Sequence, residues 1–250
     1  MPTTTPLKAM ILAAGLGTRL KPLTESTPKA LLLIAGKPLI TYQLRLLAHY
    51  GCKEVVINLH WLGELIEKEL GNGKKFGLKI HYSYEERILG TGGGILKAAP
   101  FFGQVPFLVM NSDILIDVDL KALFAFHQKK KGAATLVVTP LPAGAPFTPV
   151  WSNPQGRLLR IGNPPPAGLN TSAKLFTGVQ VLTPRLLERL PLSAPSCIIR
   201  NGIEPAMAAG ETVFGYPYQG YFRDVGTLER YQAADREIST GQIQLSYGHT

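Results

Sequence analysis

Short apolar runs alternate with amphipathic stretches along most of this chain. The apolar runs are mainly aliphatic and end at glycine, proline or polar residues, as do strands buried on both faces of a sheet. The stretches between them repeat apolar residues at a spacing near 3.6, which indicates helices. We expect strands at 8–13, 54–58, 78–82, 106–110, 134–138, 177–182 and 212–216, and helices at 38–49, 62–70, 94–99, 120–130, 184–190, 203–209 and 227–238.

This alternation predicts an α/β fold with a mostly parallel sheet and helices on both faces. The character of the chain changes after Thr139, because 140–166 is rich in proline and glycine. Residues 150–151 and 157–161 flank the turn sequence Asn-Pro-Gln-Gly, so we expect an irregular β insertion there.

Length and composition narrow the class of protein. A chain of 250 residues can form one α/β domain, and we expect a single domain over 1–250. Its nucleotide-binding half would lie at about 8–139 and its substrate-facing half at about 140–238. Charged residues make up 17% and hydrophobic residues 45%, which excludes long disorder and coiled coil. The net charge of +9 favours anionic partners: nucleic acid, anionic lipid or small phosphorylated substrates.

The cysteines and the basic runs restrict these options. Cys52 and Cys197 lie far apart without a CxxC neighbour, so we expect two reduced thiols in a cytoplasmic protein. No apolar run approaches the ~18–20 residues that span a bilayer, and 1–7 lacks the pattern of a signal peptide. The strong basic run at 129–131 ends a predicted helix and has no interleaved aromatic residues. We therefore expect neither a membrane nor a nucleic-acid partner.

A glycine-rich loop follows the first predicted strand. It begins like the dinucleotide-binding pattern GxGxxG, but Leu20 stands at the third glycine, and the Gly-Lys-Ser/Thr of a Walker loop is missing. A loop at this end of a parallel strand is where open α/β sheets bind ligands. Arg19 and Lys29 add positive charge, and Pro22 and Pro28 stiffen the segment that carries them. The alternative is a surface turn with two solvated cations.

Two aspartates are candidate ligands for a hard cation. Asp113 follows the apolar strand at 106–110, and Mg²⁺ commonly binds one or two carboxylates together with substrate phosphates. Asp113 could instead cap a turn. Asp117 and Asp119 are the rival candidates, and of these Asp119 is expected to cap the next helix. Asp224 precedes the last predicted helix, where capping is the ordinary role of an aspartate, and spacing does not show that Asp113 and Asp224 meet.

A second glycine cluster, Gly-Thr-Gly-Gly-Gly at 90–94, precedes a predicted helix. Backbone without side chains would let a base or ribose approach closely, and a helix N-terminus favours negative charge. The alternative is a flexible hinge. Glu85 and Glu86 come just before the cluster, where a carboxylate could accept hydrogen bonds from a base edge or simply be solvated.

Together these motifs resemble the signature of sugar-1-phosphate nucleotidylyltransferases. The matching segments are Leu-Ala-Ala-Gly-Leu-Gly-Thr-Arg-Leu at 12–20, Pro-Leu-Thr at 22–24, Pro-Lys at 28–29, Glu85, Leu-Gly-Thr-Gly-Gly at 89–93, Asn-Ser-Asp at 111–113, Phe-Thr-Gly-Val at 176–179 and Asp-Val-Gly-Thr at 224–227. The resemblance implies a Rossmann-like fold and Mg²⁺-dependent transfer of a nucleoside monophosphate from an NTP to a sugar 1-phosphate, with release of pyrophosphate. It is greatest to short N-acetylmuramate-1-phosphate uridylyltransferases, and next to small mannose-1-phosphate guanylyltransferases.

The resemblance also assigns roles to individual residues. Arg19 and Lys29 would act on the phosphates in catalysis, and Asp113 and Asp224 would bind Mg²⁺. The nucleotide pocket would contain Leu12, Ala13, Ala14, Gly15, Gly17, Thr18, Glu85, Gly90 and Gly93. The sugar side would contain Asn163, Thr177 and Gly178.

The sequence departs from the family pattern mainly on the sugar side. Gly-Asn-Pro at 162–164 replaces a Glu-Lys-Pro whose lysine helps to hold the sugar phosphate in many members, so that contact is lost or supplied elsewhere. Ala14 favours UTP or dTTP, with guanylyl transfer as the alternative. The five histidines show no Ser/His/Asp arrangement, which this chemistry does not need. A regulatory module that binds the same ligands without catalysis is the alternative function.

Overall fold

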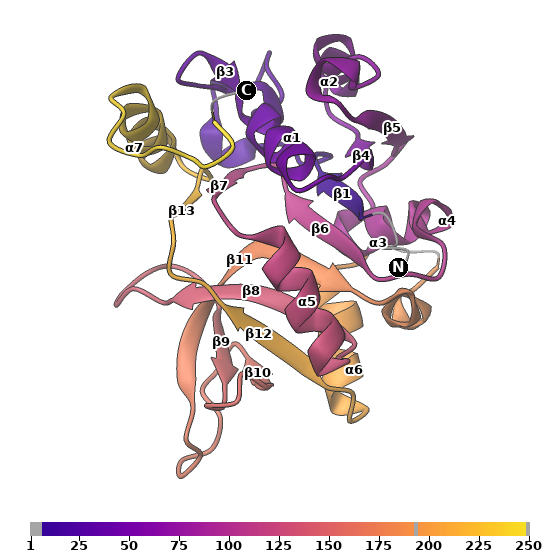
Figure 1. The fold of residues 1–250 in the computed structure, drawn as a ribbon, viewed down its shortest axis with the longest axis vertical. Helices are drawn as coiled ribbons and strands as arrows, with labels where there is room; N and C mark the ends of the chain where they lie inside the picture. Colours follow the sequence, from indigo (N-terminus) through magenta and orange to yellow (C-terminus); the bar gives the residue numbers. More distant parts are fainter. Residues whose placement is uncertain (1–6, 193–194, 249–250) are drawn as a thin grey trace.

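The computed structural model describes residues 7–192 and 195–248. Its largest sheet contains nine strands and runs through the whole molecule (Figure 1). The strands of the structure are β1 Lys8–Leu12, β2 Leu33–Ile34, β3 Lys37–Pro38, β4 Glu54–Leu59, β5 Lys79–Tyr84, β6 Phe107–Asn111, β7 Ile114–Ile116, β8 Ala134–Pro140, β9 Pro149–Ser152, β10 Leu158–Ile161, β11 Ser172–Leu182, β12 Val213–Pro217 and β13 Phe222–Asp224.

The α-helices are α1 Leu39–His49, α2 Gly63–Leu70, α3 Gly90–Lys97, α4 Ala99–Phe102, α5 Leu120–Lys130, α6 Glu204–Ala208 and α7 Leu228–Ser239. Shorter 3₁₀ turns cover Thr18–Leu20, Lys29–Leu31, Lys74–Phe76 and Pro184–Arg189, and a π-helical turn covers Ile198–Ile203. Among the described residues, no helix is long and apolar enough to cross a membrane.

The first half of the chain forms a parallel sheet in the order β5-β4-β1-β6. β1, β4 and β6 are largely buried on both faces, as their continuous apolar runs predict, whereas the edge strand β5 is partly exposed. On β6, Leu108 and Met110 belong to one core cluster, and Phe107 and Val109 belong to the cluster on the other face. The predicted α/β class, with a mostly parallel sheet between helices, is confirmed.

β11 joins this parallel sheet to the second half. It pairs antiparallel with β6, β8 and β9, so the sheet is continuous between the two halves. A bulge interrupts its ladder with β8 between Phe176 and Gln180. Gly178 lies in the bulge at φ +85°, a conformation that favours glycine. The expected hairpin is present, since β9 pairs antiparallel with β10.

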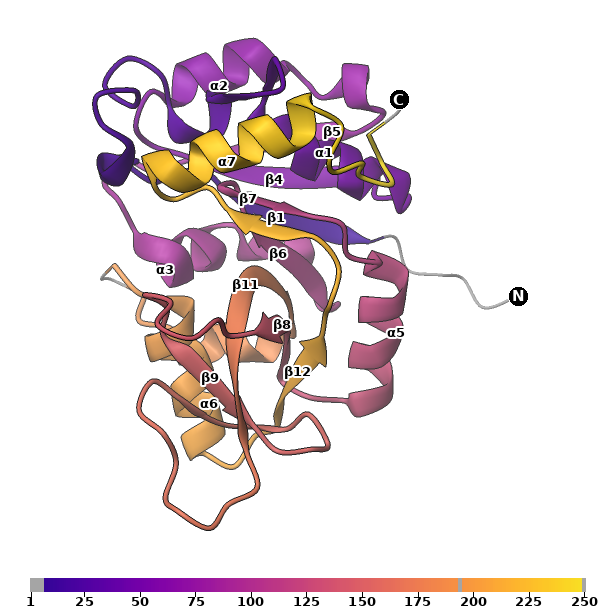
Figure 2. The ribbon, with the colours of Figure 1, turned by 90° about the vertical axis from the view of Figure 1, so that its left-hand side faces the viewer.

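The last part of the chain returns from the second half to the first. β12 pairs with β8, whereas β13 pairs antiparallel with β7, and α7 then lies along the first half (Figure 2). In the β13–β7 ladder Asp224 is opposite Ile114, the residue after Asp113. The Val225 N–H also donates to the Asp113 carbonyl oxygen at 2.8 Å. The two aspartates are therefore neighbours in the fold.

The expected elements differ from the observed ones at several places. The helix expected at 94–99 begins at Gly90, so the glycine cluster forms its first turns, and Pro100 lies in the first turn of α4 because proline is tolerated there. Residues 184–189 form a 3₁₀ helix, and the helix expected at 203–209 is α6, Glu204–Ala208, which follows directly on the π turn that ends at Ile203. β7 and β13, each of three residues, were not predicted.

We predict that Thr177→Val destabilises the protein by about 1–2 kcal/mol. Thr177 is 2% exposed, and its Oγ1 donates to the Val137 carbonyl oxygen at 3.0 Å, opposite the bulge. Valine has nearly the same shape but would leave that carbonyl without its donor. Urea unfolding measures the change, and Thr177→Ser, which keeps the hydroxyl, is the matched control. Equal stability of Thr177→Val and wild type would contradict this role.

Candidate active site

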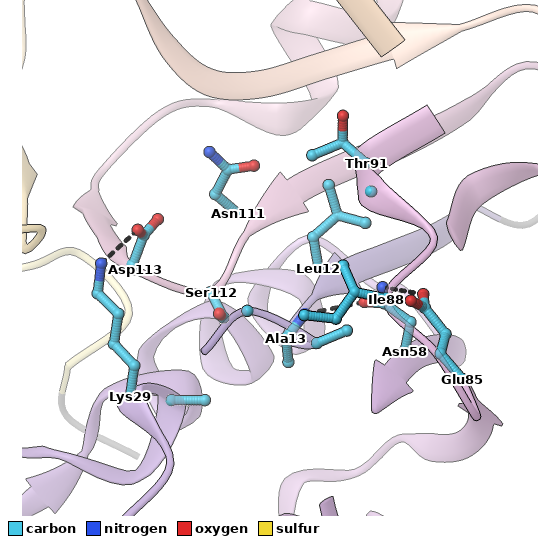
Figure 3. A pocket seen from close by; sticks show the side chains of 14 residues that line it. Leu12, Ala13, Lys29, Asn58, Glu85, Ile88, Thr91, Asn111, Ser112 and Asp113 are labelled. Atoms are coloured by element: carbon cyan, nitrogen blue, oxygen red, sulfur yellow. Dashed lines mark hydrogen bonds and ion pairs between the residues drawn. The ribbon is translucent and has the colours of Figure 1, made fainter. Parts of the chain in front are cut away.

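A pocket of about 230 Å³ opens at the carboxyl ends of β1, β4 and β6. In Figure 3, Lys29 and Asp113 lie on one side of it and Asn58 and Glu85 on the other. The full lining is Leu12, Ala13, Ala14, Gly15, Lys29, Ala30, Asn58, Glu85, Ile88, Gly90, Thr91, Asn111, Ser112 and Asp113. The pocket thus has a charged side and a side of amide, carboxylate and apolar groups, a combination that suits a ligand with both phosphates and a base.

Three residues that are in register on neighbouring strands, Leu12, Asn58 and Asn111, line this pocket. Leu12 pairs with Asn58 on one neighbouring strand and with Asn111 on the other, so two asparagine side chains flank an apolar one. Parallel strands in register place such residues side by side at the edge where open α/β sheets bind ligands. Asn58 was missed by the sequence reasoning. Its signal was present, because an amide ends the otherwise apolar run Val-Val-Ile before it.

Asn58 connects the first loop to Glu85. The Ala13 N–H donates to Asn58 Oδ1 at 2.8 Å, and Asn58 Nδ2 donates to Glu85 Oε1 at 2.7 Å. Glu85 Oε2 accepts from the Leu89 N–H at 2.9 Å, and the side chain is 5% exposed. The carboxylate at the predicted position therefore lines the pocket. These two side-chain hydrogen bonds tie the carboxylate to the chain itself, so it holds the loop at Ala13, through Asn58, and the start of α3 in place.

The glycine-rich loop after β1, residues 13–29, is held by its own polar groups. Thr24 is 1% exposed, and its Oγ1 donates to the Gly17 carbonyl oxygen at 2.9 Å. A Cβ at Gly17 would lie 2.9 Å from Thr24 Cγ2, and its φ of +65° also favours glycine. Pro28 precedes the turn that carries Lys29, and its carbonyl oxygen accepts from the Leu31 N–H at 2.8 Å. Gly17 and Thr18 shape the loop without lining the pocket.

Three cationic side chains surround the two predicted metal ligands. Lys29 Nζ lies 2.5 Å from Asp113 Oδ2, and Arg230 Nη1 lies 2.5 Å from Asp224 Oδ1. A Cβ built at Gly226 would lie 2.7 Å from Asp224 Oδ1 and 3.2 Å from Arg19 Nη2, so the glycine lets the Arg19 guanidinium approach that carboxylate. Arg19 and Asp224 thus lie beside the pocket lining, on the side of Asp113.

This arrangement fits a magnesium ion. The β13–β7 ladder brings together two carboxylates, and no described group of three His, Cys, Asp or Glu side chains could form a closed metal site. Mg²⁺ binds one or two carboxylates plus phosphates and keeps several waters, whereas a structural zinc site needs about four protein ligands. The cations on both aspartates compete with a metal ion and would also neutralise substrate phosphates.

The second glycine cluster forms the start of α3 and packs closely against other parts of the chain. Only Gly90, among the cluster's glycines, lines the pocket. Gly93 is buried inside α3, where a Cβ would lie 2.9 Å from Leu89 Cβ, so the structure does not place it against a nucleotide. At Gly94 a Cβ would lie 2.6 Å from Glu85 Oε1. The glycines let α3 pack tightly on the chain itself.

The sugar-side residues do not reach the pocket lining either. Asn163 is exposed between β10 and β11. The Thr177 hydroxyl is committed to the bulge, so its side chain has a structural role. Gly178 is nearest the pocket, since a Cβ there would lie 2.7 Å from Nδ2 of the pocket residue Asn111. The absence of a side chain at Gly178 therefore leaves room for the side chain of Asn111.

Comparison with known proteins places the chain in a family. Residues 8–241 match the family described as nucleotidyl transferase. The chain belongs to this family. A relative from Neisseria meningitidis, an N-acetylmuramate alpha-1-phosphate uridylyltransferase, is 38% identical over 233 residues, which cover 91% of this chain and 96% of the relative.

Other members of the nucleotidyl transferase family differ in length. The catalytic subunit beta of mannose-1-phosphate guanylyltransferase from Drosophila pseudoobscura pseudoobscura is 34% identical over 226 residues, which cover 88% of this chain but 59% of that subunit. A Bacillus anthracis structure assigned as a glucose-1-phosphate thymidylyltransferase superposes with a TM-score of 0.82 at 20% identity, over 96% of this chain and 97% of that one. The last likeness supports the Rossmann-like fold.

We predict that Asn58→Asp destabilises the protein more at about pH 8 than at about pH 5. The new carboxyl would face Glu85 Oε1 across the present 2.7 Å contact. Two adjacent carboxylates repel each other when both are ionised, so the pKa of one of the two is raised in the folded state. The free energy of unfolding therefore falls as the pH rises through that pKa. Urea unfolding at both pH values measures this. Adding Glu85→Gln should remove most of the pH dependence, and its persistence would contradict the Asn58–Glu85 contact.

We also predict that Cys197 reacts with a thiol reagent at least about tenfold faster than Cys52 near pH 8. Burial raises the pKa of the Cys52 thiol to about 12. Burial also raises the pKa of Cys197, but hydrogen bonds from the backbone of Arg200 and Ile199 outweigh it, and the pKa lies below its ordinary value. Peptide mapping after brief alkylation measures both rates. Faster loss of Cys52, or equal rates, would contradict the difference.

Proposed function

We propose that this protein transfers a nucleoside monophosphate from an NTP to a sugar 1-phosphate and releases pyrophosphate. The observation that carries the proposal is the neighbouring pair Asp113 and Asp224, with Lys29, Arg19 and Arg230 around it at the mouth of the pocket. Family membership supports it. Residues 8–139 would bind the nucleotide and 140–238 the sugar phosphate.

The reaction needs positioning and charge more than a protein nucleophile. A phosphate oxygen of the sugar 1-phosphate attacks the α-phosphorus of the NTP, and the bond from that phosphorus to the β-phosphate oxygen breaks, so pyrophosphate carries away the electron pair. Catalysis then depends on bringing anions together in line and stabilising their charge. Mg²⁺ held by Asp113 and Asp224 would neutralise phosphate oxygens and polarise the phosphorus centre.

The chain's own residues would divide the remaining work. Arg19 and Lys29 would bind the NTP phosphates and the leaving pyrophosphate, because both stand on a loop held by buried contacts. The pocket between Leu12, Asn58 and Glu85 would take the nucleoside. The Asn58–Glu85 contact keeps that wall rigid, so the base enters a preformed site.

We further propose that the base is uracil or thymine, with guanine as the alternative. Ala14 lines the pocket, where its methyl group narrows the space that a glycine would leave for a purine. The uridylyltransferase from Neisseria meningitidis, which this chain matches over nearly its whole length, supports the same choice. The free thiols Cys52 and Cys197 support a reducing compartment such as the cytoplasm.

The decisive assay measures pyrophosphate release from four NTPs, each with mannose 1-phosphate, glucose 1-phosphate or N-acetylmuramate 1-phosphate and Mg²⁺. We expect release only when NTP, sugar phosphate and metal are all present. We predict that Asp113→Asn lowers kcat/KM at least about 100-fold, because one metal carboxylate is lost.

Asp119→Asn is the matched control, since Asp119 caps α5 away from the site and asparagine caps equally well. An unchanged rate in Asp113→Asn would refute the metal assignment. Tight NTP binding without turnover on any sugar phosphate would favour a regulatory binding module.

A further inference from the structure

Arg230 is held at the site by three separate contacts. Its Nη1 lies 2.5 Å from Asp224 Oδ1, and its Nε donates to Thr227 Oγ1 at 3.1 Å. Its guanidinium carbon lies 5.1 Å from the centre of the Phe147 ring, within the range of a cation–π contact. These contacts fix a long side chain in one place before any ligand arrives.

The contact with Phe147 shows which side of Asp224 the Arg230 guanidinium occupies. Phe147 lies between β8 and β9, in the half of the chain that the proposed function gives to the sugar phosphate. The guanidinium of Arg19, which comes from the loop after β1 in the other half, lies beside Gly226, as does Asp224 Oδ1. Asp224 is thus flanked by two guanidinium groups, one from the NTP side and one in contact with the sugar side.

The hydrogen-bonding capacity of Arg230 is only partly used. Nη1 is buried, and although it forms an ion pair with Asp224, it has no hydrogen bond of good geometry among the described residues. Asp224 Oδ1 already accepts from the Gly226 N–H at 2.9 Å. A planar guanidinium with free donors beside a carboxylate that can bind a metal is suited to a phosphate, which it can bind through two parallel hydrogen bonds.

We propose that Arg230 binds the phosphate of the sugar 1-phosphate, in place of the lysine that Gly-Asn-Pro at 162–164 lacks. This inference rests on the proposed function. In the free protein Arg230 neutralises Asp224. Asp224 would hold Mg²⁺ together with Asp113, and the Arg230 guanidinium, kept in position by Thr227 and Phe147, would then be available to the incoming phosphate.

Steady-state kinetics of Arg230→Gln tests the proposal, with the sugar 1-phosphate that supports wild-type turnover. Losing a charge-assisted hydrogen bond should raise the KM for the sugar 1-phosphate by about 10-fold to 100-fold and change the KM for the NTP by less than about 2-fold. The KM of Arg230→Lys for the sugar 1-phosphate should lie between those of wild type and Arg230→Gln, because lysine keeps the charge but lacks the paired N–H donors of the guanidinium. Calorimetry with that sugar 1-phosphate, in the presence of Mg²⁺ and a non-hydrolysable NTP analogue, should show the same weakening without turnover.

Two controls separate this role from its rivals. Arg236→Gln removes an equal charge from an exposed position on α7 and should leave both KM values unchanged. Lys174→Gln removes the cation on β11 that is four residues from Gly178. The proposal is overturned if Lys174→Gln raises the KM for the sugar 1-phosphate and Arg230→Gln does not. It is also overturned if Arg230→Gln lowers only the Mg²⁺ concentration needed, as expected of a group that merely neutralises Asp224.

Wild-type turnover is measured first, so the two levels of inference fail separately. No turnover on any sugar 1-phosphate would refute the proposed function. Turnover with an unchanged sugar-phosphate KM in Arg230→Gln would refute only the role of Arg230. Thermal unfolding of each variant shows whether it is folded, and Phe147→Leu, which keeps the apolar volume but removes the ring, should raise the same KM by a few-fold.

Discussion

The short ladder between β7 and β13 fixes where the last part of the chain pairs with the segment that follows β6. Its pairs are Asp224 with Ile114, Arg223 with Leu115, and Phe222 with Ile116. Side chains alternate between the faces of a strand, so a slip of one residue would turn Asp224 away from Asp113. The register is protected by burial of Ile114, Leu115 and Ile116, and by side chains that bond their carbonyl oxygens, with Tyr247 Oη donating to Ile116 O at 2.9 Å.

The charges of the site follow from that ladder. Once two carboxylates are adjacent, each needs a counter-ion, and Lys29 and Arg230 supply them, with Arg19 beside. The same cations lie where several substrate phosphates would have to meet. A preorganised set of charges needs little rearrangement on binding, which is how such a site can accelerate a reaction between anions. Three of the positive charges behind the net charge of +9 thus lie around Asp113 and Asp224.

Glycine serves packing in this fold more than ligand contact. The sequence shows a glycine-rich cluster at 90–94 but not what approaches it. In the structure, a Cβ at Gly94 would strike Glu85, and one at Gly90 would lie 2.5 Å from the Ser196 carbonyl oxygen. The partner at Gly90 is more than a hundred residues away in sequence, so local pattern has no access to it. Thr177 and Gly178 likewise belong to a bulge whose register depends on β8 and β6, which are distant in sequence.

Local pattern was sufficient for the α/β class, most strands and helices, the cap at Asp119 and the glycine-rich loop after the first strand. Those features depend on residues close together in the chain: apolar runs, a capping side chain, glycines and prolines in a turn. The resemblance to the family implied a joint role for Asp113 and Asp224, but only the tertiary structure shows how they become neighbours, and it alone decided that Asn58 holds Glu85 and that Arg230 pairs with Asp224. The reason is that β7 and β13 have only three residues each and gain their stability from pairing across more than a hundred residues, which no periodicity within either segment records.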